Sequence, residues 1–401
     1  MLIVKKFGGT SVGNKERIFN VARRCVEEYQ KGNKVVVVLS AMGKMTDELL
    51  KMANDINPNA SKRELDMLLT TGEQTSVALT AMAISALGVP AVSLNAFQVK
   101  MHTDNRYGSA RLKDIDAERI ENELEQGKIV LVTGFQGVDK YDNYTTLGRG
   151  GSDTTAVALA AVLHADACEI YTDVDGVYTA DPRVVENAFK LNEITYNEML
   201  ELASLGAGVL HNRSVELAKK YGVQLEVRSS LNTSEGTVVK EETKMERMLV
   251  SGVAGDKDVA RIALIGLKDE PGVAFKVFNI LAKKNINVDI ILQSIGRDGS
   301  KDIAFTVSES IVDEAVELIE SKFSSYYQSI DVSKDVAKVS IVGAGMTSNP
   351  GVAAKMFEVL SDVGINIRMI SSSDINITVV IGEKDTDKAM NVVHDAFFKE
   401  R

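Results

Sequence analysis

A glycine-rich turn between a strand and a helix occurs twice in this chain and constrains its fold more than any other feature. One copy lies in NYTTLGRGGSDTTAV at 143–157, where three glycines, an arginine and an aspartate share one turn. The glycines let a ligand approach the backbone, the following helix start carries partial positive charge, and Arg149 adds a cation that fits a carboxylate or phosphate. The turn therefore predicts an anion site. The simpler alternative is an ordinary helix start, with Ser152 and Asp153 as its caps.

The second copy of this turn opens the chain. LIVKKF reads as a strand, GGTSVG as its turn and KERIFNVARRCVEEY as an amphipathic helix. Lys6 ends the strand, where it can reach the β- and γ-phosphates of a nucleotide held by the amides of Gly8, Gly9 and Thr10. The pattern differs from the Walker motif, which needs Gly-Lys-Ser/Thr after a longer loop. The predicted apolar face of the helix consists of Ile18, Val21, Ala22, Cys25 and Val26.

Strand and helix patterns alternate over residues 1 to about 245. This alternation is typical of a mainly parallel sheet covered by helices on both faces, and such sheets bind ligands at the carboxyl ends of their strands. Both glycine-rich turns and the step from Thr172 to Asp173 fall at predicted strand ends. The length of 401 residues, with 45% hydrophobic content and five prolines, suits two or three domains.

Composition narrows the class of protein. A net charge of −10 leaves no basic stripe for a phosphate backbone, so nucleic acid is not an expected partner. Cys25 and Cys168 lie in apolar patterns, which indicates buried free thiols. Neither a signal-peptide core nor an apolar span of about 18 residues occurs, so we expect a cytoplasmic protein without a membrane segment. No structural metal is expected, because no ligand spacing relates His102, His164, His211 and His394.

The C-terminal part contains an internal repeat. DEPGVAFKVFNILAKKNINVDIILQS and SNPGVAAKMFEVLSDVGINIRMISSS align without a gap, and Pro271 corresponds to Pro350 at an offset of 79 residues. Each copy reads as a βαββαβ unit of the ligand-sensing kind. The second copy lacks its last strand. The best candidate to supply it is LVSGVAG at 249–255, which would insert copy one within copy two.

These patterns divide the chain into an α/β domain at 1–245, a first repeat at 261–334, and a second repeat built from 249–256 and 336–401. The polar run KEETKMER at 240–247 reads as the linker. The segment GAGMTSN begins like a dinucleotide fingerprint, but its sixth position is Ser348 rather than glycine, so we do not expect a nicotinamide site.

Several segments together resemble the aspartate kinases of the amino-acid kinase superfamily. They are KFGGTSVG at 6–13, SAMGKMTDELL at 40–50, LLTTGEQ at 68–74, the GRGGSD turn, and YTDVDGVYTADPR at 171–183. The resemblance covers essentially the whole chain, and the repeats resemble ACT domains. It implies an amino-acid kinase-like open, mainly parallel sheet followed by two ferredoxin-like ACT domains. The implied activity is ATP-dependent phosphorylation of the side-chain carboxylate of L-aspartate to 4-phospho-L-aspartate, which opens lysine, threonine and methionine biosynthesis.

The same resemblance implies residue roles. Lys6 and Asp153 would serve catalysis, and the implied phosphate-binding residues are Gly8, Gly9, Thr10, Ser11, Gly150 and Gly151. Arg149 would bind the α-carboxylate of aspartate and Glu73 its ammonium group, and the pocket would be completed by Ser40, Thr46 and Ser152. The implied nucleotide-binding residues are Thr172, Asp173, Tyr178, Asp181 and Arg183. Without the resemblance, Glu73 would read as a solvated residue at a helix start.

Phosphorylating a carboxylate needs no general base, because an aspartate side chain with a pKa of about 3.9 is already ionised at neutral pH. The obstacle is repulsion between this carboxylate and a polyanionic phosphate. Lys6, loop amides, helix N-termini and Mg²⁺ that arrives with ATP are expected to offset it. Asp153 is then expected to organise Lys6 rather than to act as a base.

One segment departs from the family pattern. Where G-A-K-V-L-H-P-R is expected, the chain has GAGVLHNR, with Gly208 replacing the lysine and Asn212 the proline. That lysine is usually assigned to nucleotide phosphate in the family. The remaining cations that could make this contact are Lys6, Arg183, Lys219 and Lys220.

The repeats predict feedback inhibition by an end-product amino acid, either lysine or lysine with threonine, bound where two repeats meet. The expected effector-binding residues are Asp269, Gly272, Val273, Asn287, Gln293, Ser348, Gly351 and Asn366. Edge strands of a βαββαβ unit predict at least a homodimer through the repeats. A separately translated regulatory chain could start at Met245 or Met248.

Two other classes of function stay open. Another amino-acid kinase could act on glutamate or acetylated glutamate, but neither is expected to carry the paired repeats, and an acetylated amine would not need Glu73. A non-catalytic amino-acid sensor is the second alternative. Lys6, Arg149 and Asp153 argue against a sensor, whereas Gly208 favours it.

Overall fold

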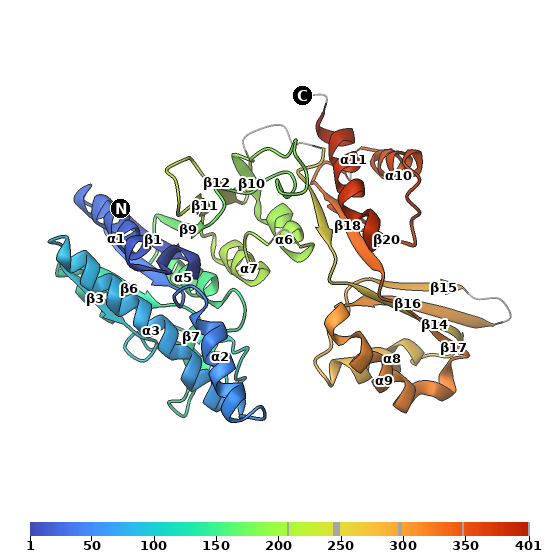
Figure 1. Cartoon of the computed structure of the whole chain (residues 1–401), viewed down its shortest axis with the longest axis horizontal. Helices are drawn as coiled ribbons and strands as arrows, with labels where there is room; N and C mark the ends of the chain where they lie inside the picture. The colour runs from blue at the N-terminus through green and yellow to red at the C-terminus, as the bar shows by residue number, and fades with distance from the viewer. Residues whose placement is uncertain (207, 244–248, 296–298, 347–348, 400–401) are drawn as a thin grey trace. The chain divides into compact units, whose positions relative to one another are not determined.

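The computed structural model describes residues 1–206, 208–243, 249–295, 299–346 and 349–399 (Figure 1). The chain divides into two compact units. The first comprises Met1–Val177, Lys190–Ala203 and Gly208–Glu246, and the second comprises Tyr178–Phe189, Ser204–Ala207 and Arg247–Arg401.

An eight-stranded sheet organises the first unit. Its strands are β1 (Leu2–Phe7), β2 (Lys34–Leu39), β3 (Ala91–Leu94), β6 (Ile129–Thr133), β9 (Ala167–Thr172), β10 (Glu193–Thr195), β11 (Leu225–Ser229) and β12 (Thr237–Lys240). They lie in the order β10-β12-β11-β9-β1-β2-β6-β3, and all neighbours are parallel except β11 and β12. The predicted open, mainly parallel sheet is thus confirmed, with β1 in its interior.

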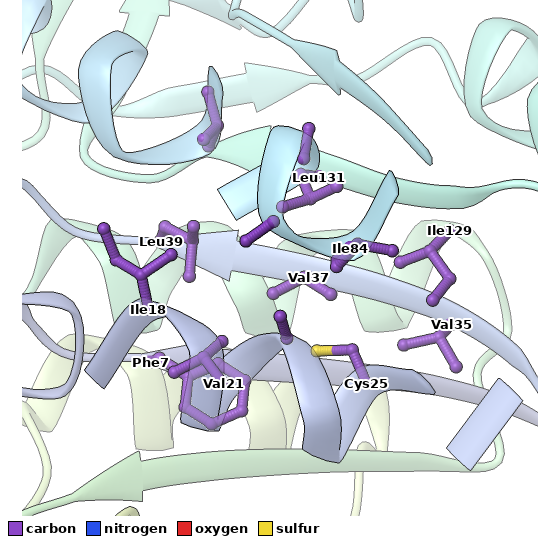
Figure 2. Close-up of a cluster of buried hydrophobic side chains, with 14 of the residues drawn as sticks. Phe7, Ile18, Val21, Cys25, Val35, Val37, Leu39, Ile84, Ile129 and Leu131 are labelled. Atoms are coloured by element: carbon purple, nitrogen blue, oxygen red, sulfur yellow. The ribbon is translucent and has the colours of Figure 1, made fainter. Parts of the chain in front are cut away.

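Helices cover both faces of this sheet. They are α1 (Lys15–Gln30), α2 (Met45–Ile56), α3 (Lys62–Ala86), α4 (Glu118–Glu125), α5 (Gly151–Val162), α6 (Tyr196–Ser204) and α7 (Asn212–Tyr221). Residues of α1 and α3, among them Cys25 and Ile84, pack with Val37 of β2 in one buried cluster (Figure 2). All five predicted apolar positions of α1 are buried. Side chains alternate along β1, so Phe7 joins this cluster while Lys6 faces α5 on the other side.

A small four-stranded sheet of the first unit was not predicted. Its strands are β4 (His102–Thr103), β5 (Leu112–Asp114), β7 (Gln136–Val138) and β8 (Tyr144–Thr146), in the order β5-β4-β7-β8. Strands of two or three residues are too short for an alternating pattern to reveal them. Because β8 ends at Thr146, this sheet leads directly into the second glycine-rich turn.

Two antiparallel sheets make up most of the second unit. The first repeat consists of β14 (Ala260–Lys268), α8 (Val273–Ala282), β15 (Ile291–Ile295), β16 (Ser300–Val307), α9 (Val312–Phe323) and β17 (Ser329–Ser333). The second consists of β18 (Val336–Val342), α10 (Val352–Asp362), β19 (Met369–Ser372), β20 (Asn376–Gly382) and α11 (Thr386–Phe398). Its fourth strand is β13 (Gly252–Asp256), which pairs antiparallel with β18. The sheet orders are β15-β16-β14-β17 and β13-β18-β20-β19, and this antiparallel architecture confirms the predicted fold of the repeats.

The segment Tyr178–Phe189 belongs to the second unit although it follows β9 in the chain. The carbonyl of Thr179 accepts a hydrogen bond from the amide of Val253 at 2.7 Å, and its hydroxyl lies 2.9 Å from Nε2 of His394. Ala180 and Val185 are buried in the core of the second repeat. The segment that resembles a nucleotide-binding motif is therefore divided between the two units.

Candidate functional site

Lys6 and Asp153 form an ion pair at the carboxyl end of β1. The Lys6 ammonium Nζ lies 2.7 Å from Oδ1 of Asp153, and the two side chains are only 12% and 11% exposed. Lys6 comes from the interior strand, and Asp153 comes from the first turn of α5. The pair therefore brings together the two glycine-rich turns, although Lys6 and Asp153 are 147 positions apart in the sequence.

The first turn continues as a short 3₁₀ helix, Gly9–Val12. A Cβ atom at Gly9 would lie 2.6 Å from the carbonyl oxygen of Ala41, so this position accepts no larger residue. The Gly8 amide donates to the carbonyl of Tyr171 at 3.3 Å, which engages one of the three amides expected to bind phosphate. Ser11 is buried, and its hydroxyl has no hydrogen-bond partner in the structure.

The second turn depends on left-handed glycines. Gly148 has φ of +80° and Gly150 has φ of +66°, and Gly150 is the N-cap residue of α5. No side chain caps this helix, so the alternative that Ser152 and Asp153 serve as ordinary caps is wrong. Both side chains are instead buried in the first turn of α5, which leaves them for the site.

Two serines join β2 to α5. The Ser40 hydroxyl, directly after β2, donates to Oγ of Ser152 at 2.9 Å. Thr46 lies half-buried in the first turn of α2, and Arg149 is exposed in the turn before α5. The fold thus brings Ser40 and Ser152 together, whereas Thr46 and Arg149 lie in separate segments, near the starts of α2 and α5.

Glu73 lies in the middle of α3 and is only 3% exposed. Its Oε1 accepts a hydrogen bond from the amide of Ala41 at 3.1 Å, and its Oε2 has no partner. Burial raises the pKa of this carboxyl to about 7. The interpretation of Glu73 as a solvated residue at a helix start is therefore wrong, because α3 begins at Lys62, eleven positions earlier.

The predicted nucleotide-binding residues fall in two places. Thr172 ends β9 in the first unit, where its hydroxyl donates to Oδ1 of Asp173 at 2.9 Å. Tyr178, Asp181 and Arg183 belong to the second unit. There the Arg183 guanidinium pairs with Asp181 at 2.7 Å, and the Asp181 carboxylate also accepts from the Arg183 amide. Asp181 therefore helps to shape this turn.

Neither α7 lysine takes up the position of the missing family lysine. Gly208 precedes α7 with φ of +50°, and Asn212 is the first residue of that helix. Lys219 and Lys220 lie in its last turn, at the other end. Lys219 donates to Oδ1 of Asn197 at 2.6 Å, and Lys220 lies over the ring of Tyr221, so both cations already have partners.

The predicted effector residues lie at the start of each repeat's first helix and in the segments that follow that helix. Gly272 and Gly351 are the left-handed N-cap residues of α8 and α10. Asp269 is paired with Lys301 at 2.6 Å. Val273 is buried as the first residue of α8, while exposed positions are taken by Asn287, Gln293 and Asn366. Ser348 lies outside the described residues, as do Met245 and Met248.

Three further observations concern the described residues as a whole. Within the described ranges, no group of three or more His, Cys, Asp or Glu side chains could hold a metal ion. In the same ranges, every helix is too short or too polar to cross a membrane. Cys25 and Cys168 are free and buried, and burial raises the pKa of the Cys25 thiol to about 12.

Fold and site together define a member of the amino acid kinase family: a parallel sheet whose central strand ends in a lysine clamped between two glycine-rich turns. The sequence profile of that family matches residues 1–229, and the ACT domain profile matches residues 262–323 and 339–397. The aspartokinase of Bacillus sp. (strain MGA3) is 52% identical over 398 residues, which cover 99% of this chain and 97% of that protein. The chain belongs to the aspartokinase family.

Solved structures agree with this assignment. E. coli aspartokinase III in complex with aspartate and ADP, in its R-state, is 28% identical with a TM-score of 0.85, over 99% of this chain and 100% of that chain. The same enzyme in complex with lysine and aspartate, in its T-state, is 28% identical with a TM-score of 0.79, over 99% of each chain.

Two residues that shape the site, Arg213 and Asp66, were not predicted from the sequence. Arg213 donates to the carbonyls of Leu147 and Ala110, both at 2.9 Å. Asp66 is 1% exposed and accepts from the amides of Gly108 and Thr146, both at 2.9 Å. Arg213 could have been found, because it is the last residue of the segment GAGVLHNR that departs from the family pattern. Asp66 had none, because acidic residues in amphipathic helices are usually solvated.

Proposed function

We propose that this chain transfers the γ-phosphoryl group of ATP to the side-chain carboxylate of L-aspartate, giving 4-phospho-L-aspartate. The observation that carries the proposal is the Lys6–Asp153 ion pair at the meeting point of two glycine-rich turns. A cation held at that point can follow the charge that develops on the transferring group. This reaction is the first step of lysine, threonine and methionine biosynthesis, and we propose that it takes place in the cytoplasm.

The roles of the phosphate-side residues follow from their chemistry. Lys6 neutralises phosphate charge, and Asp153 keeps the Lys6 ammonium directed at the turn amides. Gly9, Thr10, Gly150 and Gly151 contribute backbone to the phosphates, while the buried Ser11 hydroxyl is available for a phosphate oxygen or for Mg²⁺. Mg²⁺ enters with ATP and lowers the repulsion between the two anionic reactants.

Aspartate binding uses one buried anion and one exposed cation. The free Oε2 of Glu73 is suited to the ammonium group, because a buried carboxylate oxygen without a partner is stabilised by a cation. Arg149 binds the α-carboxylate with its guanidinium. The Ser40–Ser152 pair and Thr46 then orient the side-chain carboxylate for attack. No base is needed, since that carboxylate is already ionised.

ATP binding begins at Thr172 and Asp173, at the carboxyl end of β9. The family resemblance also assigns nucleotide contacts to Tyr178, Asp181 and Arg183, which belong to the second unit. Gly208 offers no side chain, so Lys6 supplies the cationic contribution of the first unit. A modest ATP affinity is the expected consequence.

Regulation and assembly are assigned to the repeats. We assign 1–245 to catalysis and the repeats at 261–334, and at 249–256 with 336–401, to inhibition by lysine, alone or with threonine. The α8 start around Gly272 and Val273 would hold the effector carboxylate, with Asn287 and Gln293 beside it and Gly351 and Asn366 as the counterparts in the second repeat. An effector ammonium group would compete with Lys301 for Asp269. The repeats would also join two chains into a homodimer.

A coupled ADP-release assay with aspartate, with glutamate and without an acceptor tests the activity. ADP release that depends on aspartate alone is expected. Release with glutamate would indicate a different amino-acid kinase, and no release with either would favour the sensor alternative. Adding lysine, threonine or both to the wild type and to Asp269→Ala tests the regulation. Indifference of the wild type to all three would refute feedback inhibition without affecting the kinase assignment.

A further inference from the structure

Arg213 spans two backbone segments that border the second glycine-rich turn. Its Nη1 donates to the carbonyl of Leu147, the residue before Gly148, at 2.9 Å. Its Nη2 donates to the carbonyl of Ala110 at 2.9 Å. Ala110 in turn donates its amide to Thr146, the last residue of β8, at 2.8 Å. The Arg213 guanidinium therefore bridges the two backbone segments that precede the turn.

Partial burial of the Arg213 guanidinium costs free energy unless hydrogen bonds compensate for it. Arg213 is half-buried, and burial, followed by repulsion from Arg111, lowers the pKa of its guanidinium. Hydrogen bonds from a charged donor to carbonyls are stronger than neutral ones, and they offset part of the cost of burial. Two well-oriented carbonyl contacts are thus what keeps this side chain in place.

Two neighbours of Arg213 reinforce the same turn. The ring of His211 covers Gly150 so closely that a Cβ there would lie 2.2 Å from Cβ and Cγ of the histidine. Nδ1 of His211 accepts from the backbone amide of Arg213 at 3.4 Å, so the His211 side chain is fixed at the start of α7. Asp66 accepts from the amides of Gly108, in the segment of Ala110, and of Thr146, next to Leu147.

We propose that Arg213 is a positioning residue for aspartate: it fixes the turn from which Arg149 and Ser152 reach the substrate. The inference rests on the proposed function, because it assigns those two residues to aspartate. Loss of Arg213 frees the carbonyls of Leu147 and Ala110 and loosens the turn. Since displacing a binding group by about 1 Å can cost on the order of 100-fold in rate, aspartate binding should be sensitive to this change.

The test compares Arg213→Met and Arg213→Lys with Arg119→Met. Arg119 is the matched control, because it lies on α4 and pairs there with Glu123. In Arg213→Met, the KM for aspartate should rise about tenfold while the KM for ATP stays within about twofold of the wild type. The KM of Arg213→Lys for aspartate should lie between those of the wild type and Arg213→Met. The lysine ammonium group keeps the charge but cannot reach both carbonyls as the guanidinium fork of arginine does. The control should match the wild type.

An activity-independent measurement separates this inference from the proposed function. Arg149 is exposed, so trypsin can cleave after it once the turn opens. Cleavage at Arg149 should be about fivefold faster in Arg213→Met than in the wild type or in Arg119→Met. Unchanged cleavage with an unchanged aspartate KM would overturn the inference. Equal increases in the KM of aspartate and ATP, with a lower unfolding temperature, would also overturn it. Faster cleavage in a chain that releases no ADP with aspartate would refute only the proposed function.

Discussion

The Lys6 ammonium and the Asp153 carboxylate lie 2.7 Å apart, and each is nearly withdrawn from solvent. They come from β1 and α5, so the pair fixes the distance between the two glycine-rich turns before any ligand arrives. A charge held in a fixed place needs no reorganisation during the reaction, which is why its contribution to the rate is large.

Removal of either partner should therefore reduce turnover. Lys6→Ala and Asp153→Ala are each expected to lower kcat by about 100-fold or more. The first removes the ammonium group that neutralises phosphate charge, and the second removes the carboxylate that holds this ammonium group in place. Arg149→Ala should instead mainly raise the KM for aspartate. Steady-state kinetics with varied aspartate and ATP distinguish a lower kcat from a higher KM. Near-native turnover of Lys6→Ala would exclude a role of Lys6 in neutralising phosphate charge.

Aspartate binding should depend on pH through Glu73. The pKa of this buried carboxyl is raised to about 7 in the free protein, whereas the ammonium group of aspartate needs the ionised form. The KM for aspartate should therefore rise as the pH falls below 7, approaching tenfold per pH unit. Measurements of the KM for aspartate from about pH 5.5 to 8.5 would reveal this trend. Glu73→Gln should have a high KM for aspartate at every pH in this range, because its amide does not ionise.

The same raised pKa predicts that Glu73 destabilises the free protein at higher pH. A carboxyl whose pKa is raised by folding contributes stability below its ordinary pKa of 4.5, and this contribution is lost as the pH rises through about 7. Glu73→Gln should consequently unfold at a higher temperature than the wild type at pH 8. The difference between the two unfolding temperatures should shrink as the pH falls, and it should vanish below the ordinary pKa of 4.5, where Glu73 is neutral in the folded and the unfolded chain alike.

Gly150 should not tolerate a side chain. Gly150→Ala would place a Cβ 2.2 Å from His211 and would force a left-handed residue at φ of +66°. Gly222 is a matched control, with φ of +65° and no atom within 4 Å of its Cβ position. Both substitutions carry a backbone cost of about 1 kcal/mol, but only Gly150→Ala should lower kcat/KM for aspartate, by about tenfold or more. Equal kinetic effects would show that the His211 contact is unimportant.

Lys5, next to Lys6 in β1, has a structural role. It points to the α1 face and pairs with Glu169, which also accepts from Tyr171. Although burial lowers it, the pKa of Lys5 is raised overall by Glu169 and Tyr171. Lys5→Met leaves Glu169 buried beside only the more distant Arg228, at 3.4 Å, and should lower the unfolding temperature by about 5–10 °C. Lys5→Met with Glu169→Gln should recover most of the loss in thermal unfolding, and no recovery would contradict a pairwise role.

Local patterns were sufficient to predict much of the architecture. Alternation of strands and helices, the glycine-rich turns and the 79-residue offset depend on side-chain period and backbone freedom, which are properties of neighbouring residues. The buried face of α1 followed from its period alone. The resemblance to aspartate kinases then supplied residue roles that no local pattern contains.

Contacts between distant residues were decided only by the tertiary structure. The sequence could not reveal that Glu73 is buried within a long helix, because its neighbours in the chain are polar. Nor could it reveal that Arg213 binds backbone carbonyls 66 and 103 positions away, or that Tyr178–Phe189 packs in the second unit. Burial and carbonyl partners arise when separate elements meet. The sequence therefore determined the strand and the glycine-rich turns around Lys6, whereas the tertiary structure decided the strand order and, through the packing of α3, α5 and α7, which charges face these turns.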